Sequence, residues 1–350
     1  MPASSASPDS TAVATPHPEH LTVGVGAALA AGLLWGLVFV VPLLLPEYPA
    51  TLLSFGRYFA FGLVTLPIAW WQRRALRRLT RADWWLAARL SIVGNFIYYL
   101  ALSAAIQLAG APLPTLIIGT LPVVIAVVAN QGSHAAHRIS WARLAPSLVL
   151  ISAGLLFVNA DQVARLHASG ALPAYLGGAA LAIVANAAWT WYPIHNARWL
   201  HAHREHTSTT WATAQGITTL PMAALGLALS LAWLRGTGDA RFAQSLSGPE
   251  PMTFWLLMTV VGFGASWLGT LLWNIASKNT PTALTGQLIV FETLAALAYA
   301  YLVYQRSPSG FEIAGIALLV LGVLVGVRAL ANPAQTRTRP RSSARDDGLA

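Results

Sequence analysis

The sequence predicts an all-α integral membrane protein with ten transmembrane helices, arranged as a 5+5 inverted-topology repeat. Three observations lead there: 56% of the 350 residues are hydrophobic, only 9% are charged, and long uncharged stretches separate the charges. An average soluble chain carries about 25% charged residues, so this chain has too few to cover a soluble surface. It has no cysteine, which excludes a disulfide framework, a thiol nucleophile and a thiolate metal site.

The uncharged stretches have the length of membrane crossings. No Asp, Glu, Lys or Arg lies between Arg89 and Arg138, which gives room for two crossings because each needs about 20 mostly apolar residues. The segment AGAPLP at 109–114 divides that stretch with a short turn. The same reasoning predicts spans 1 to 10 at 21–45, 51–71, 84–107, 112–130, 142–160, 173–195, 209–234, 253–276, 281–304 and 311–331.

The spans group into two units with a tail at each end. Residues 1–20 are rich in Ser, Pro, Ala and Thr and contain no Lys or Arg, so they predict a disordered tail rather than a signal peptide. Residues 21–160 and 173–331 form the two predicted five-helix units, and residues 332–350 form a basic tail. No segment is long enough for a separate soluble domain.

The basic residues orient the chain. With the N-terminus inside, 15 of the 21 Lys and Arg residues fall in cytoplasmic segments and 4 in outer loops, while Arg57 and Arg89 lie within spans. The positive-inside rule therefore predicts that both termini are cytoplasmic, in a multi-pass protein of the inner or plasma membrane. The net charge of +9 is explained by these loops, which contact anionic lipid headgroups, and we expect no nucleic-acid partner.

Short sequence matches relate the two units. GLVTLPIA at 62–69 in span 2 matches GITTLPMA at 216–223 in span 7 at five of eight positions, and GAALA occurs at 26–30 and again at 178–182. A unit of five spans is odd, so its duplicate enters the membrane in the opposite direction. Such inverted repeats are typical of secondary transporters, in which the halves rock about a central site; a purely structural duplication is the other interpretation.

Further residues carry a resemblance to a known family. They are Trp35-Gly36, Arg57, Pro122 in TLPVVIAVVA, Trp189, Tyr192, the segment VFETLAALAYAYLVYQR in span 9 and the closing GFEIAGIALLVLGVLVG. Over roughly residues 22–331 the chain resembles the drug/metabolite transporter superfamily in its EamA-type branch. It departs from the family pattern at Glu292-Thr293, where Glu-Pro is common, and at Gln305-Arg306 in place of Glu-Arg. The resemblance implies a cavity between the repeats, lined by spans 1, 3, 4, 6, 8 and 9.

Glu292 is the only acidic residue near the middle of a predicted span. Eleven residues of helix beyond Pro281 place it roughly 16 Å deep, close to the bilayer midplane. A charge at that depth is costly and marks an ion path, a proton relay or a substrate contact. Proton coupling through Glu292 is therefore one hypothesis, and a hydrogen-bonded structural Glu is the other. Arg57 could pair with a substrate carboxylate or a buried polar group, or snorkel outward, and the structural interpretation is preferred.

Polar and aromatic side chains recur at helical spacing on several spans, and at such depths they turn away from lipid. Aromatic rings beside amides suit a small amphipathic solute, although packing between helices explains any single residue equally well. The candidate substrate-binding residues are Trp35, Asn95, Tyr98, Tyr99, Asn186, Trp189, Trp267, Asn274 and Glu292.

The predicted function is secondary transport, with export of a small metabolite, amino-acid-like or drug-like solute by alternating access. The alternatives are a membrane-embedded enzyme acting on lipid and, with less support, a channel. An enzyme of that kind needs paired carboxylates or a Ser/His constellation within the membrane, and only one acid is deep. The histidines of HAHREH at 201–206 match no metal spacing, so we expect no metal or cofactor. A monomer and a homodimer are both compatible with the sequence.

Overall fold

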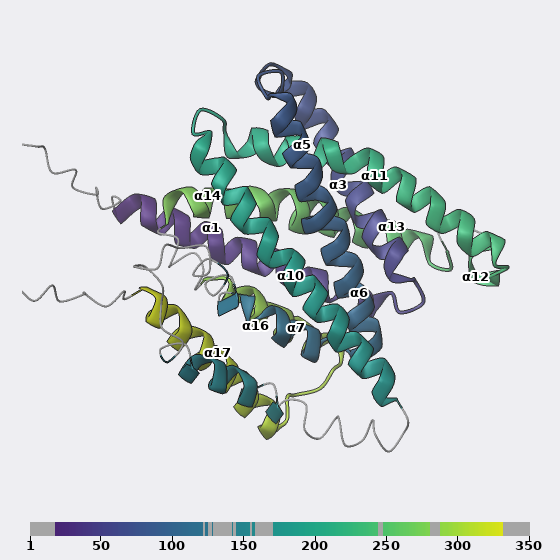
Figure 1. The fold of residues 1–350 in the computed structure, drawn as a ribbon. Helices are drawn as coiled ribbons and strands as arrows, with labels where there is room; N and C mark the ends of the chain where they lie inside the picture. Colours follow the sequence, from purple (N-terminus) through teal and green to yellow (C-terminus); the bar gives the residue numbers. More distant parts are fainter. Residues whose placement is uncertain are drawn as a thin grey trace, which may run out of the picture.

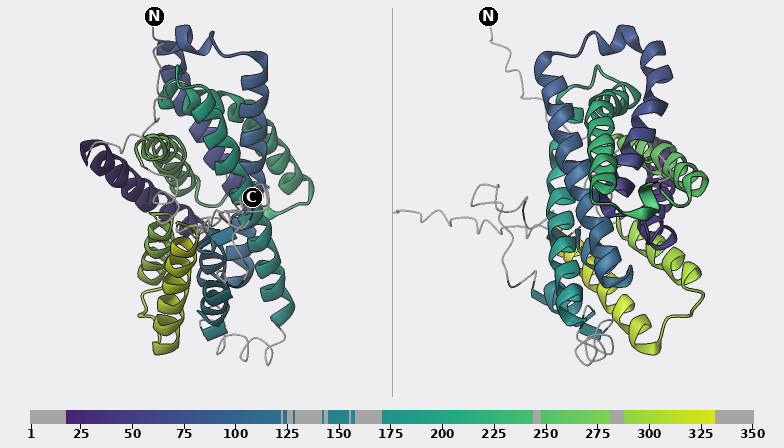
Figure 2. Two further views of the ribbon diagram at one scale, coloured as in Figure 1. Left: turned by 60° about the vertical axis from the view of Figure 1, so that its left-hand side comes forward. Right: turned by 90° about the vertical axis from the view of Figure 1, so that its right-hand side faces the viewer.

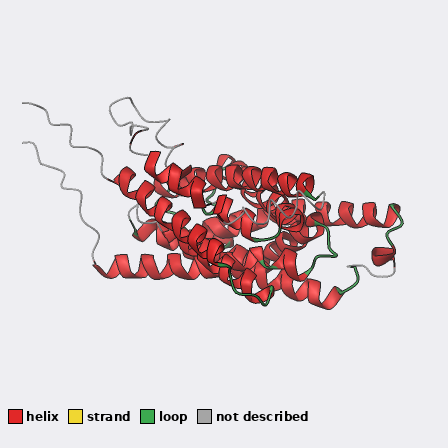
Figure 3. Cartoon of the chain, turned by 90° about the horizontal axis from the view of Figure 1, so that it is seen from below, coloured by secondary structure: helices red, strands yellow, loops and turns green. Residues whose placement is uncertain are grey.

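The computed structural model is a bundle of α-helices (Figure 1), and all the regular structure among the described residues is helical (Figure 3). The structure describes residues 18–121, 123–124, 128, 142, 145–154, 156–157, 171–243, 248–280 and 288–331. In chain order the helices are α1 (Pro18–Gly36), η1 (Leu37–Phe39), α2 (Val41–Leu44), α3 (Ala50–Trp71), α4 (Arg73–Leu76), α5 (Arg81–Leu90), η2 (Ser91–Ile97), α6 (Tyr98–Ala109), α7 (Pro112–Ile118), α10 (Leu172–Ala202), α11 (Ser208–Gly236), α12 (Ala240–Ala243), α13 (Pro251–Val261), η4 (Gly262–Leu268), α14 (Gly269–Asn279), α16 (Val290–Val303) and α17 (Gly310–Ala331).

Six helices in the described part of the chain are long and apolar enough to cross a membrane, which confirms the multi-pass prediction. Helices suit lipid because every backbone N–H and C=O is satisfied within the segment. The six run over Leu21–Leu44, Ala50–Trp71, Arg81–Ala109, Leu172–Leu200, Ser208–Gly236 and Pro251–Asn279. The predicted spans 112–130, 142–160 and 281–304 lie partly outside the described residues. Pro122, the predicted tail 332–350 and most of the predicted tail 1–20 lie outside them.

Two of the crossings contain a π-helical turn in their middle. The helix of Arg81–Ala109 consists of α5, the π-helical η2 and α6, and that of Pro251–Asn279 consists of α13, the π-helical η4 and α14. A π-helical turn holds more residues than an α-helical turn, so it rotates the faces of the helix after it relative to those before it. Side chains of η2 and η4 therefore leave the stripe that an uninterrupted α-helix predicts.

The helices pack in pairs that are distant in sequence: α3 against α11, α10 against α6, and α1 against both α14 and α16. Glycines permit the closest of these approaches. A Cβ on Gly62 in α3 would lie 2.6 Å from Cβ of Leu220 in α11, and one on Gly216 would overlap the Thr65 side chain. In α1, a Cβ on Gly36 would lie 3.0 Å from the backbone nitrogen of Ala296 in α16.

A smaller group of helices lies at one end of the molecule (Figure 2). There α16 and α17 pack with the apolar helix Ala145–Gly154 through a separate hydrophobic cluster. The Ser147 hydroxyl donates a hydrogen bond to the carbonyl of Gly322 at 2.7 Å. Before α17, Arg306 forms a bidentate ion pair with Glu312, and both N···O distances are 2.8 Å. Position 305, where the family pattern has Glu, is Gln here, so the carboxylate that pairs with Arg306 comes from α17 instead.

Candidate functional site

Aromatic side chains from four helices meet in the interior. Trp35 of α1 lies edge-on to Trp189 of α10, with ring centroids 5.3 Å apart, and 5.2 Å from Trp273 of α14. Trp189 is also stacked between Tyr98 of α6 at 4.7 Å and Tyr192 of its own helix at 5.0 Å. All five rings are buried. We call these five residues the aromatic cluster; such contacts add to the free energy of apolar burial and fix ring orientation.

Hydrogen bonds and glycines fix two of these rings. The indole Nε1 of Trp35 donates to the carbonyl of Ala265 in η4 at 2.9 Å. Gly269 leaves room for that indole, since a Cβ there would lie 2.7 Å from Nε1. The Tyr192 hydroxyl donates to Oε1 of Gln215 at 2.8 Å, and its ring lies directly over Gly94 of η2.

Arg57 of α3 is buried next to this cluster and does not snorkel outward; it is 4% exposed. Its Nε donates to the hydroxyl of Ser266 in η4 at 2.9 Å. Its guanidinium carbon lies 4.4 Å from the ring centroid of Tyr99 and 4.9 Å from that of Tyr58, which is cation–π geometry. Its Nη1 is buried without a hydrogen-bond partner, so one donor remains available.

Glu292 of α16 is the buried acid of this region and is 2% exposed. Its Oε2 is buried without a hydrogen-bond partner, and the carboxylate has no cation within 4 Å among the described residues. Gly32 of α1 lets the two helices approach here, because a Cβ there would lie 3.2 Å from the Glu292 nitrogen. Burying unpaired charges is costly, so this arrangement is well suited to a polar solute.

A polar network extends from the aromatic cluster along α10 and α11. The side-chain oxygen of Asn196 accepts from Nε1 of Trp211 at 2.8 Å and from Nε2 of Gln215 at 3.2 Å. Its amide nitrogen donates to Oδ1 of Asn274 in α14 at 3.1 Å. Since Gln215 also accepts from Tyr192, the network ties three helices to one side of the cluster.

We expect Asn196→Ala to lower the free energy of unfolding by about 1–3 kcal/mol, because it leaves the buried N–H groups of Trp211 and Gln215 without an acceptor. The measurement is the Tm of the purified protein in detergent. Asn279→Ala is the matched control, since among the described residues Asn279 donates only to Ile275 of its own helix. Equal losses of Tm in the two variants would contradict the role assigned to the network.

The structure brings together six of the predicted site residues. Trp35, Tyr98 and Trp189 are in the aromatic cluster, and the backbone of Glu292 packs against Gly32, about one turn from Trp35 on α1. Tyr99 lies against Arg57 and donates to the carbonyl of Val38 at 3.2 Å. Asn274 joins through the Asn196 network, and its own amide nitrogen is buried without a partner.

Three predicted residues have other surroundings. Asn95, in η2, donates to Thr219 of α11 at 3.1 Å. Trp267, in η4, stacks on Phe263, which is 44% exposed. Asn186 donates to the carbonyl of Ile117 at 2.7 Å and to the Thr120 hydroxyl at 2.9 Å, joining α10 to the end of α7. Asn186 also lines a separate cavity of about 410 Å³ between these helices.

Several residues of the site were not among the sequence candidates: Arg57, Trp273, Ser266, Asn196 and Gln215. Span 6 was predicted to end at residue 195, but α10 continues to Ala202, so Asn196 lies inside a helix. A polar residue in the middle of an apolar segment is the signal that would have found Gln215, which lies within the predicted span 209–234.

The histidines at the end of α10 pack against an indole. His203 and His206 lie over Trp199, with ring centroids 4.7 and 5.6 Å away. Trp199 donates to Oδ1 of Asp83 at 2.6 Å. Within the described part of the chain, no three His, Cys, Asp or Glu residues are grouped so that they could hold a metal ion.

Comparisons with known proteins agree on the class of protein. The model of the EamA-like transporter family matches residues 22–160. "Inner membrane protein YtfF" of Escherichia coli (strain K12) is 47% identical over 307 residues, which are 87% of this chain and 95% of that protein. A solved structure, described as "Crystal structure of protein", has a TM-score of 0.57 at 19% identity and covers 87% of this chain and 97% of its own. The last likeness concerns the fold alone.

Proposed function

Because the chain belongs to the EamA-like transporter family, we propose that it is a secondary transporter that exports a small metabolite, amino-acid-like or drug-like solute by alternating access. The observation that carries the proposal is that a basic and an acidic side chain, Arg57 and Glu292, are both buried and both have an unsatisfied polar atom. Nη1 of Arg57 and Oε2 of Glu292 each lack a hydrogen-bond partner. A solute that carries both a negative and a positive group would satisfy both atoms.

The residues divide the recognition chemistry among them. The Arg57 guanidinium suits a carboxylate or another planar anion. Glu292 suits an ammonium group, and the indoles of Trp35, Trp189 and Trp273 suit a cation or an apolar side chain. Tyr98 and Tyr99 complete the lining of the proposed binding site. Asn95, Asn186, Trp267 and Asn274 remain proposed binding residues that would contact the solute in another conformation of the protein.

The proposed architecture is ten helices in two inverted five-helix repeats. Helix pairing supports it: α10 against α6 joins spans 6 and 3, and α1 against α14 joins the corresponding spans 1 and 8. The repeated motifs at 62–69 and 216–223 meet where α3 crosses α11, at Gly62 and Gly216. A symmetry axis through that crossing would let the two halves rock about a site between them.

We place the protein in the inner membrane with both termini in the cytoplasm. The distribution of basic residues, 15 on that side against 4 on the other, supports this orientation. The 47% identical relative is an inner membrane protein. Proton exchange through Glu292 is the proposed energy source, and uncoupled facilitation is the competing mechanism.

The proposal is tested by comparing the metabolites of cells with and without the protein. We expect at least one zwitterionic or cationic solute to accumulate inside cells that lack it. Reconstituted protein should then move that solute across liposomes without altering it. Chemical conversion of the solute, or no flux of any accumulated solute, would overturn the proposal.

A further inference from the structure

The end of the molecule where α3 ends and α11 begins carries a dense positive charge. Five arginines lie within residues 73–81, at positions 73, 74, 77, 78 and 81. The acid that follows them, Asp83, is held by the Thr80 nitrogen at 2.8 Å, the Thr80 hydroxyl at 2.7 Å and the Trp199 indole at 2.6 Å. Its oxygens are therefore engaged within the protein and form no ion pair with these arginines.

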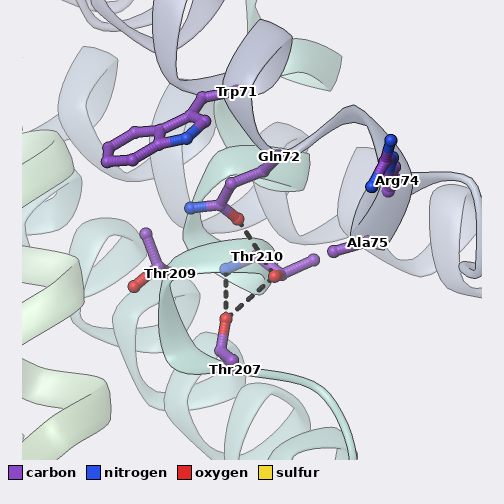
Figure 4. Close-up of a pocket in the computed structure, with 7 residues that line it drawn as sticks. All are labelled: Trp71, Gln72, Arg74, Ala75, Thr207, Thr209 and Thr210. Atoms are coloured by element: carbon purple, nitrogen blue, oxygen red, sulfur yellow. Dashed lines mark hydrogen bonds between the residues drawn. The ribbon is translucent and has the colours of Figure 1, made fainter.

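A pocket of about 460 Å³ lies at this end, between α3, α4 and α11 (Figure 4). Its lining residues are Trp71, Gln72, Arg74, Ala75, Thr207, Thr209 and Thr210. Gln72 accepts a hydrogen bond from the Thr210 hydroxyl at 3.0 Å, which fixes the back of the pocket. Figure 4 shows Trp71 and Arg74 on either side of Gln72.

Arg74 is the cation of the pocket. It is exposed, and no carboxylate lies within 4 Å of it in the described part of the chain. The neighbouring Arg73 is engaged differently: it donates to the carbonyl of Trp70 at 3.0 Å, and its guanidinium lies 5.1 Å from the Trp70 ring centroid. The N-terminus of the 29-residue helix α11, which is the positive end of its dipole, also lies beside the threonine hydroxyls.

Exposed tryptophans indicate how deep in the bilayer this pocket lies. Trp70 is 74% exposed and Trp71 is 86% exposed, both at the end of a helix able to cross the membrane. Amphipathic indoles in such places lie at the headgroup level of the bilayer. The pocket therefore opens where lipid phosphates are concentrated, and not in bulk solvent.

We propose that this pocket binds the phosphate headgroup of an anionic phospholipid. Arg74 pairs with the phosphodiester, the hydroxyl of Thr209 donates to one of its oxygens, and the Trp71 indole lies along the glycerol and the first methylene groups. Basic pockets between membrane helices recognise lipid headgroups by this chemistry. The bound lipid bridges α3 and α11, the two helices whose crossing is proposed to be the axis of the transport motion.

The test uses the full-length protein in neutral detergent, titrated with phosphatidylglycerol or phosphatidylcholine, with native mass spectrometry counting bound lipid. We expect phosphatidylglycerol to bind more tightly than phosphatidylcholine, and Arg74→Gln to weaken that binding about fivefold. Ala75→Phe fills the pocket while keeping every charge, and should weaken binding as well.

Arg78→Gln is the matched control, because it removes the same charge from the same segment but does not line the pocket. It should change affinity less than twofold, and all variants should keep the unmodified Tm. Equal losses in Arg74→Gln and Arg78→Gln would overturn the proposal in favour of a diffuse surface attraction. Equal binding of phosphatidylcholine, or displacement of the lipid by equimolar glycerol 3-phosphate, would also overturn it.

Discussion

Replacing Glu292 with glutamine should abolish the pH dependence of transport and lower proton-driven flux at least tenfold. Glutamine keeps the shape of the protonated acid but neither releases nor accepts a proton, and position 292 is buried, so the substitution acts inside the protein. The measurement is solute flux into proteoliposomes with and without an imposed pH gradient.

Two variants make this result specific. Glu292→Asp keeps a carboxylate and should retain a pH response with reduced flux. Glu47→Gln removes an exposed acid at the end of the molecule and should behave like the unmodified protein. If Glu292→Gln keeps full flux with the usual pH response, Glu292 is not the proton carrier. Full flux without any pH response in the unmodified protein would favour uncoupled facilitation.

Gly94→Ala should displace the Tyr192 ring and lower transport at least tenfold. A Cβ at position 94 would lie 2.6 Å from Cγ and 3.0 Å from Cβ of Tyr192. That ring is stacked on Trp189, and its hydroxyl is hydrogen-bonded to Gln215, so it cannot move aside without disturbing the aromatic cluster. Overpacking of this kind costs about 1–3 kcal/mol, and Tm in detergent should fall together with flux.

Gly264→Ala provides the control for this prediction. Gly264 lies in the π-helical segment η4, as Gly94 lies in η2, but the nearest atom to its added Cβ is Cδ2 of Leu34 at an ordinary 3.6 Å. Tm and flux should therefore stay close to those of the unmodified protein. Equal effects of the two substitutions would mean that glycine is needed in these segments for backbone reasons, and not to admit the Tyr192 ring.

The π-helical turns separate residues that helical periodicity groups together. An uninterrupted α-helix would place Asn95, Tyr98 and Tyr99 on one face of span 3, and Trp267 and Asn274 on one face of span 8. The first member of each set lies in a π-helical turn, which shifts its face relative to the residues that follow. In the structure Tyr98 is in the aromatic cluster, Tyr99 lies against Arg57 and Asn274 bonds Asn196. Asn95 contacts α11 instead, and Trp267 stacks on Phe263.

Arg57 illustrates a second difficulty. Depth in a span is readable from the sequence, and it made snorkelling a reasonable expectation. Whether the side chain turns inward depends on Ser266 and Tyr99, which come from helices far away in the chain. No local pattern contains that information.

The sequence by itself determined the membrane class, the placement of six crossings and the family, because hydrophobic length and short motifs are local properties. It also identified Glu292, since a lone acid in an apolar segment is conspicuous whatever the fold. Only the tertiary structure decided that Arg57 turns inward to Ser266, that Trp273 packs against Trp35 and that Asn196 joins three helices. Glycines set how closely the helices approach and π-helical turns set which faces meet, and both act between segments that are distant in the chain.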